Sequence, residues 1–143
     1  MAGTVHIVCP YCHATNRVRE DGVTAARCGQ CRRPLFDGHS IGLTSEAFTR
    51  HVQHSGIPVV VDFWAPWCGP CRMMAPAYEA AAKELEPSVR FAKVNTDEEQ
   101  DLAGRLGIQS IPTVILFKEG REVARQAGAM GAPQLMNWIR SHR

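Results

Sequence analysis

The sequence predicts an α/β fold with a mixed central sheet and helices on both faces, preceded by a small cysteine-rich module. An unbroken β-branched and aromatic run at 59–64 is typical of a strand buried on both faces. Apolar residues at helical spacing separate it from a second run at 89–94, which favours a right-handed parallel β–α–β unit. The N-terminal part instead lacks sustained apolar periodicity and holds four of the six cysteines. We therefore expect two domains, 1–36 and 37–143.

Helices are expected in three places before the C-terminal part. The first lies around residues 43–52, where apolar side chains recur on one face. The second covers 70–86 and should be kinked by Pro76, which cannot donate a helical hydrogen bond. A capping box at 96–99 predicts the start of a third helix that runs through Leu106.

The C-terminal part is expected to form two strands and a helix. Residues 113–117 and 122–127 flank a Gly-containing turn, which predicts an antiparallel hairpin. Pro133 should begin the last helix, with Leu135 and Ile139 on its apolar face.

Composition and charge exclude several classes of function. No apolar run approaches the roughly 18 residues that cross a membrane, so we expect no membrane partner. Net charge is +2, and bound thiolates would neutralise much of the basic N-terminal part, so we expect no nucleic-acid partner. Residues 1–10 lack the basic and apolar segments of a secretory signal, which favours the cytoplasm. A monomer is expected.

Four cysteines form two pairs near the N-terminus. The arrangement Cys9-x₂-Cys12-x₁₅-Cys28-x₂-Cys31 has the spacing of a structural zinc ribbon. Four thiolates complete a tetrahedral Zn²⁺ site and leave no open position for catalysis by the metal. Two disulfides, free thiols, or iron in the same site are the alternatives.

The third pair, Cys68-Gly69-Pro70-Cys71, lies where the strand at 59–64 ends and a helix begins. Unpaired N–H groups and the helix dipole should lower the pKa of Cys68. Gly69 permits a tight turn and Pro70 fits a first helical turn, which brings Cys71 within disulfide reach. The pattern predicts thiol–disulfide exchange, in which Cys68 attacks and Cys71 resolves the mixed disulfide. A structural or metal-binding pair is the alternative.

The stretch 62–71 resembles the active-site segment of the thioredoxin family. The resemblance continues through Pro76, residues 93–95, 111–113 and 117–120, and Gly128-Ala129. It covers about residues 40–143 and implies a thioredoxin fold. It also implies a protein-disulfide reductase that acts on disulfide-containing proteins and is regenerated by thioredoxin reductase. With a zinc ribbon ahead of it, the chain is similar to the bacterial thioredoxin 2 type, which carries no organic cofactor.

The resemblance also implies a substrate groove beside the cysteine pair. Pro112 is expected in the cis form, which leaves the backbone near Ile111 free to pair with an extended substrate. Trp67 should flank this groove, and Gly128 should contribute to substrate binding. Gly69 and Pro70 belong to the same active-site scaffold.

Two charged residues interrupt apolar strands. Burial should raise the pKa of Asp62, so that it can accept a proton near neutral pH, as deprotonation of Cys71 requires. The resemblance supports this general-base role, acting through a water molecule. The alternative is a strand-edge aspartate that points into solvent. The resemblance places Lys93 beside Asp62, where it either pairs with the carboxylate or stays a solvated edge lysine.

Several other side chains are interpreted as structural. Trp64 and Trp138 are expected in the core, and His51 and His54 are expected to be solvated on a surface helix.

Two other functions fit parts of the sequence. In one, the ribbon recruits a partner for an inactive scaffold, but a scaffold needs neither the cysteine pair nor Asp62. A disulfide oxidant or isomerase is disfavoured by the Gly-Pro spacer and by the missing signal segment.

Overall fold

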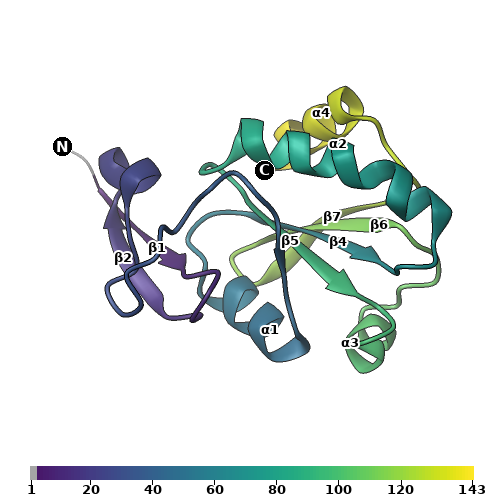
Figure 1. The fold of residues 1–143 in the computed structure, drawn as a ribbon, viewed down its shortest axis with the longest axis horizontal. Coiled ribbons are helices and arrows are strands. Elements are labelled where there is room, and N and C mark those ends of the chain that lie inside the picture. The colour runs from purple at the N-terminus through teal and green to yellow at the C-terminus, as the bar shows by residue number, and fades with distance from the viewer. Residues whose placement is uncertain (1–2) are drawn as a thin grey trace.

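The structure, a computed structural model, describes residues 3–143 (Figure 1). Its elements in chain order are β1 (Thr4–Val8), β2 (Thr15–Arg19), the 3₁₀ helix η1 (Glu20–Ala25), β3 (Ile41–Gly42), α1 (Ser45–His54), β4 (Val59–Trp64), α2 (Gly69–Leu85), β5 (Arg90–Asn95), α3 (Gln100–Arg105), β6 (Thr113–Lys118), β7 (Arg121–Ala127) and α4 (Ala132–His142). We call residues 3–36 the cysteine module and residues 37–143 the α/β domain.

The central sheet of the α/β domain has five strands in the order β3-β5-β4-β6-β7. Strand β4 is parallel to β5 and antiparallel to β6, and β6 forms a hairpin with β7. The expected mixed sheet is therefore confirmed. Its register places Asp62 opposite Lys93 on one side and Val114 on the other.

Helices cover both faces of this sheet, as the apolar run in β4 predicts. Helices α2 and α4 lie on one face and α1 and α3 on the other (Figure 1). Successive side chains of a strand point to opposite faces, so Val60 packs below α2 with Tyr78, whereas Val61 and Phe63 pack toward α1 with Phe48. Each face thus has its own apolar core.

Local signals set the starts of α1 and α2. The Thr44 side chain caps α1 by accepting a hydrogen bond from the Ala47 N–H at 3.2 Å. Cys68 is the N-cap of α2, and Pro70 lies in its first turn, where a missing N–H leaves no bond unmade. Pro76 lies inside α2, which continues past it to Leu85.

The predicted capping box at 96–99 is wrong. Helix α3 begins only at Gln100, and Glu99 makes no side-chain cap. The Thr96 hydroxyl donates instead to the Trp64 carbonyl at 3.1 Å, and a Glu99 oxygen accepts from the Ser45 N–H. Both side chains are used in contacts between elements, so neither is free to cap the helix.

The cysteine module is built on a hairpin that the sequence did not predict. Strands β1 and β2 pair antiparallel from Thr4 opposite Arg19 to Val8 opposite Thr15. The buried core of the module consists of Ile7, Leu35, Cys9 and Cys28. A core this small cannot stabilise a fold alone, so the module depends on a metal, on the α/β domain, or on both.

Truncation of a buried residue of α4 tests the layer arrangement. Leu135 is fully buried between α4 and the sheet, so Leu135→Ala should lower the free energy of unfolding by about 2–5 kcal/mol. The control Val123→Ala removes a side chain that is 45% exposed on β7 and should change it by less than about 0.5 kcal/mol. Urea unfolding measures both, and equal losses would contradict the packing of α4.

Candidate active site and cysteine cluster

Cys68 and Cys71 are joined by a disulfide at the N-terminal end of α2. Their Cα atoms are 5.3 Å apart, within the usual range for a disulfide. The Cys68 sulfur also accepts a hydrogen bond from the Cys71 N–H at 3.2 Å. Because this N–H belongs to the open first turn of the helix, it can stabilise negative charge on the sulfur when the disulfide is reduced.

The loop that precedes β6 contacts the sulfur of Cys68. The Ile111–Pro112 bond is cis, as expected, and the Ile111 carbonyl oxygen lies 3.7 Å from the Cys68 sulfur. Gly128 donates its N–H to the Pro112 carbonyl at 2.9 Å. Its φ of +95° lies in the region that favours glycine. Segments far apart in sequence thus meet at Cys68.

Trp67 flanks this site and is 67% exposed. Its indole N–H donates to both oxygens of Asp97, at 2.9 and 3.2 Å. Beside it, a shallow groove is lined by Ala103, Ile108 and Ile111. The sequence analysis missed Asp97, which fixes the orientation of an otherwise free aromatic side chain.

Asp62 is fully buried in β4, and within residues 3–143 neither carboxylate oxygen has a hydrogen-bond partner. Burial raises the pKa of Asp62 to about 7, while the positive charge of Lys93 opposes the shift and the charge of Glu79 adds to it. The alternative of a solvent-facing aspartate is therefore wrong. The carboxyl group changes protonation state near neutral pH.

Lys93 lies in β5, an inner strand of the sheet, so it is not an edge lysine. Its ammonium group lies 4.7 Å from the centre of the Trp64 ring, a cation–π contact. Trp64 itself is half-buried, as is Trp138, so neither is a full member of the core. Lys93 therefore influences Asp62 by charge across the strand pair, and no ion pair between them occurs in the described chain.

The four remaining cysteines form two turns with the same hydrogen bonds. The Cys9 sulfur accepts the N–H groups of Tyr11 and Cys12, and the Cys28 sulfur accepts those of Gln30 and Cys31. In both turns the residue four positions after the first cysteine has a positive φ: 63° at His13 and 70° at Arg32. The two turns therefore present their sulfur atoms in equivalent ways.

The sulfur positions fit a tetrahedral metal ion. All four Sγ atoms lie within 4.8 Å of one another, and the closest cross-turn pairs are 3.5 and 3.6 Å apart. Four thiolates about 2.3 Å from one ion would be about 3.8 Å apart. None of these cysteines is in a disulfide. Burial raises the pKa of the Cys9 thiol to about 12, so a metal ion would have to displace its proton.

The expectation that His51 is solvated is wrong. It is 1% exposed, because it lies on the same face of α1 as Phe48 and is covered by the cysteine module. Its Nε2 lies 3.2 Å from Nδ1 of His13. Burial lowers the pKa of His51 to about 3, so the ring is neutral.

Arg90 is a second residue that the sequence analysis missed. It begins β5 between two apolar residues and is only 2% exposed. Like Asp62, Arg90 is a charge inside an apolar strand, so the same sequence signal marks both residues.

Comparison with known proteins settles the family. The sequence pattern of the thioredoxin family matches residues 39–141. Thioredoxin C-3 of Corynebacterium nephridii is 40% identical over 134 residues, which cover 93% of this chain and 92% of that protein. The chain belongs to the thioredoxin family.

Two other thioredoxins match a smaller part of this chain. Thioredoxin 1 of Synechococcus elongatus is 46% identical over 100 residues, covering 70% of this chain and 94% of its own. A solved thioredoxin of Malassezia sympodialis superposes with a TM-score of 0.64 at 34% identity, covering 71% of this chain and 88% of its own. The longer match to thioredoxin C-3 must extend into the cysteine module.

Membership in the thioredoxin family makes the chain a thiol–disulfide oxidoreductase, with Cys68–Cys71 as its redox pair. The cysteine cluster could hold a metal ion. Within residues 3–143, no helix has the length and apolar character needed to cross a membrane.

The pH dependence of stability tests the buried carboxyl group. The pKa of Asp62 rises from 3.8 to about 7 on folding, so the protonated form favours the folded state. That contribution is complete below about pH 4 and is lost as pH rises to about 7. Asp62→Asn removes the titration, so its stability relative to wild type should increase by about 4 kcal/mol between pH 4 and pH 8. Urea unfolding of wild type and Asp62→Asn, each with the Cys68–Cys71 disulfide formed, measures this difference. Parallel curves of stability against pH for the two proteins would contradict a buried, titrating Asp62.

Proposed function

We propose that the chain is a protein-disulfide reductase in which Cys68 is the attacking thiolate and Cys71 the resolving thiol. The observation that carries this proposal is the position of Cys68, which caps α2, accepts a backbone N–H, and lies 3.7 Å from the Ile111 carbonyl. A sulfur at a helix N-terminus forms its thiolate readily, and the thiolate is the nucleophile in disulfide exchange.

The reaction begins from the reduced pair. The Cys68 thiolate attacks one sulfur of a substrate disulfide, which breaks that bond, forms a mixed disulfide and releases the other substrate sulfur as a thiolate. Cys71 then loses its proton and attacks Cys68. The substrate leaves as a dithiol, and the Cys68–Cys71 disulfide found in the structure is the product. Two electrons pass from the cysteine pair to the substrate. The substrate thiolates take up two protons from water, which balance the protons that Cys68 and Cys71 lose.

Asp62 is proposed as the base that receives the Cys71 proton through a water molecule. Its pKa of about 7 supports this role, because such a carboxylate can both take and return a proton at neutral pH. Lys93 would assist by favouring the ionised carboxylate. Among the described residues 3–143, Asp62 forms no hydrogen bond that would hold it permanently in one protonation state.

Substrate is proposed to lie in the groove beside Trp67, against the backbone of Ile111 and the Pro112–Gly128 contact. Gly69 and Pro70 would hold the turn that presents Cys68. An extended substrate segment can pair with exposed main-chain groups there. Thioredoxin reductase would return the disulfide to the dithiol.

A second part of the proposal concerns the N-terminal segment. We propose a domain boundary between residues 36 and 37, and Zn²⁺ as the metal held by Cys9, Cys12, Cys28 and Cys31. The closed set of four thiol ligands supports a structural ion with no role in the exchange reaction. Free thiols in this cluster also support a reducing compartment such as the cytoplasm.

Replacement of each redox cysteine tests the assigned order. In NADPH-coupled reduction of a model protein disulfide, Cys68→Ser should lose about a thousandfold in rate or more, because it lacks the nucleophile. Cys71→Ser should still attack but should accumulate a mixed disulfide with the substrate, visible by mass spectrometry. Trapping by Cys68→Ser instead of Cys71→Ser would reverse the two roles.

Metal content tests the second part of the proposal. The purified chain should contain one zinc ion, and Cys31→Ser should weaken zinc binding by several orders of magnitude because one of four ligands is lost. Much of the disulfide reductase activity should remain, since the ion takes no part in the exchange. A wild-type chain that binds no zinc under reducing conditions would refute the metal assignment.

A further inference from the structure

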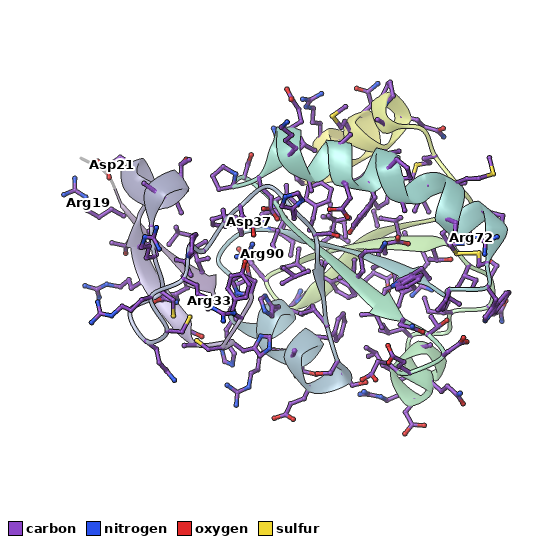
Figure 2. All side chains as sticks on the ribbon, viewed as in Figure 1. Arg19, Asp21, Arg33, Asp37, Arg72 and Arg90 are labelled. Carbon is purple, nitrogen blue, oxygen red and sulfur yellow. A yellow bond between two sulfur atoms is a disulfide. The ribbon has the colours of Figure 1, made fainter. Side chains whose placement is uncertain are left out.

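The cysteine module is joined to the α/β domain through the buried guanidinium group of Arg90. Figure 2 shows Arg90 and Asp37 at the boundary between the two parts, with Arg33 nearby on the module side. Arg90 belongs to β5, at the edge of the α/β domain that faces the module. It is 2% exposed, so the module covers it almost completely.

One nitrogen of Arg90 binds two separate segments of the module. Its Nη2 donates to the Leu35 carbonyl at 2.8 Å and to the Val8 carbonyl at 3.2 Å. This uses both hydrogen atoms of that nitrogen. Val8 directly precedes the first metal-ligand turn, and Leu35 ends the segment that carries the second. A single side chain of the α/β domain thus holds the two turns in register.

The rest of the guanidinium group faces a carboxylate and an aromatic ring. Its Nη1 lies 3.7 Å from the buried Glu86 carboxylate, and its carbon lies 4.1 Å from the centre of the Phe36 ring. A buried arginine is tolerated only when its charge is paired and its donors are used. Three of the four partners, Val8, Leu35 and Phe36, belong to the module, so Arg90 makes this set of contacts only when the module is docked in this arrangement.

Further contacts join the module to the α/β domain around Arg90. The Gly56 N–H donates to the His6 carbonyl at 2.7 Å, and a Cβ atom at Gly56 would lie 2.8 Å from the Val5 side chain. On the other side, Tyr11 donates to Asp37 at 2.9 Å. Backbone contact this close requires one defined position of the module.

We propose that Arg90 is a positioning residue for the metal site, so that metal binding by the module and stability of the α/β domain are coupled. The inference rests on the metal assignment proposed above and deepens it. The ligands come from the module alone, but the arrangement that brings the two turns together comes from the α/β domain.

Coupling follows because the metal and Arg90 select the same conformation. The metal requires both cysteine turns at one point, and Arg90 requires the Val8 and Leu35 carbonyls at one point. Each therefore lowers the free energy needed to form the state that the other binds, and the effect must be equal in both directions. The small core of the module makes this state unfavourable without help.

The coupling acts far from the redox pair. Helix α2 has 17 residues and spans about 25 Å, with Cys68 at its start and Glu86, the partner of Arg90, at its end. In Figure 2, Arg72 near the redox pair lies at the opposite end of the molecule from Arg19 and Asp21 of the module. Metal affinity is therefore the direct measure of the role of Arg90.

The test compares metal binding by the full chain and two variants under reducing conditions. Co²⁺ is the probe, because tetrahedral thiolate coordination gives it a visible spectrum, and Zn²⁺ is then added in competition. Arg90→Met should weaken Co²⁺ and Zn²⁺ binding about tenfold without changing the Co²⁺ spectrum, since the four thiolates remain. The matched control is Arg17→Met. Arg17 is exposed on the module, makes no side-chain hydrogen bond or ion pair within residues 3–143, and should shift affinity less than about twofold.

The reciprocal measurement is thermal unfolding of the α/β domain with and without Zn²⁺. Metal should raise the melting temperature of wild type and of Arg17→Met, and should raise that of Arg90→Met distinctly less. Equal metal affinity in all three proteins, or an equal shift in melting temperature, would overturn the coupling. A wild-type chain that gives no thiolate–Co²⁺ spectrum would overturn the metal assignment and the coupling together.

A second route covers the case in which Arg90→Met does not fold, since it leaves Glu86 buried without its cation. The double variant Arg90→Met with Glu86→Gln removes that unpaired charge. Gly56→Ala disturbs the contact between the module and the α/β domain at a different point, because its Cβ atom would clash with Val5, and it leaves Arg90 in place. Weaker metal binding in these variants would support the coupling, and wild-type affinity in both would refute it.

Discussion

Because β4 lies between β5 and β6 and is covered by helices on both faces, the position of its last residue is fixed by packing before α2 begins. The chain then has only a short turn in which to start the helix, so Cys68 becomes the N-cap. The neighbouring strand β6 begins just after the cis Pro112, which brings the Ile111 carbonyl to the same sulfur. Burial of one strand thus determines the surroundings of the reactive group.

The same packing gives the molecule a second polar centre at the other end of α2. Where the helix ends, Glu86 turns back to accept the Phe91 N–H and to face Arg90. Burial raises the pKa of Glu86 to about 7, and the charge of Arg90 opposes this rise. The redox pair and the module boundary are therefore placed by one rigid helix, although no single residue takes part in both.

Much of the α/β domain could be predicted because its signals are local. The apolar run of β4 and the helical spacing in α2 follow from periodicity alone, and a charge inside such a run identified Asp62. The errors concern side chains whose partners are distant in sequence. Thr96 donates a hydrogen bond to the Trp64 carbonyl, and His51 is covered by His13. Neither environment can therefore be inferred from the residues next to it in the sequence. The cis form of Pro112 was expected only from the family resemblance.

The two buried charged residues, Asp62 and Arg90, are under different constraints. Asp62 has no hydrogen-bond partner within residues 3–143 and is destabilising when ionised, so stability alone would favour an apolar or amide side chain there. Its presence fits the proton transfer that we propose for the exchange reaction. Arg90 has every kind of partner that a buried guanidinium needs, two carbonyls, a carboxylate and an aromatic face. These contacts are what holding two segments of the module in one arrangement requires. Asp62 therefore fits the proposed exchange reaction, and Arg90 fits the proposed assembly of the metal site.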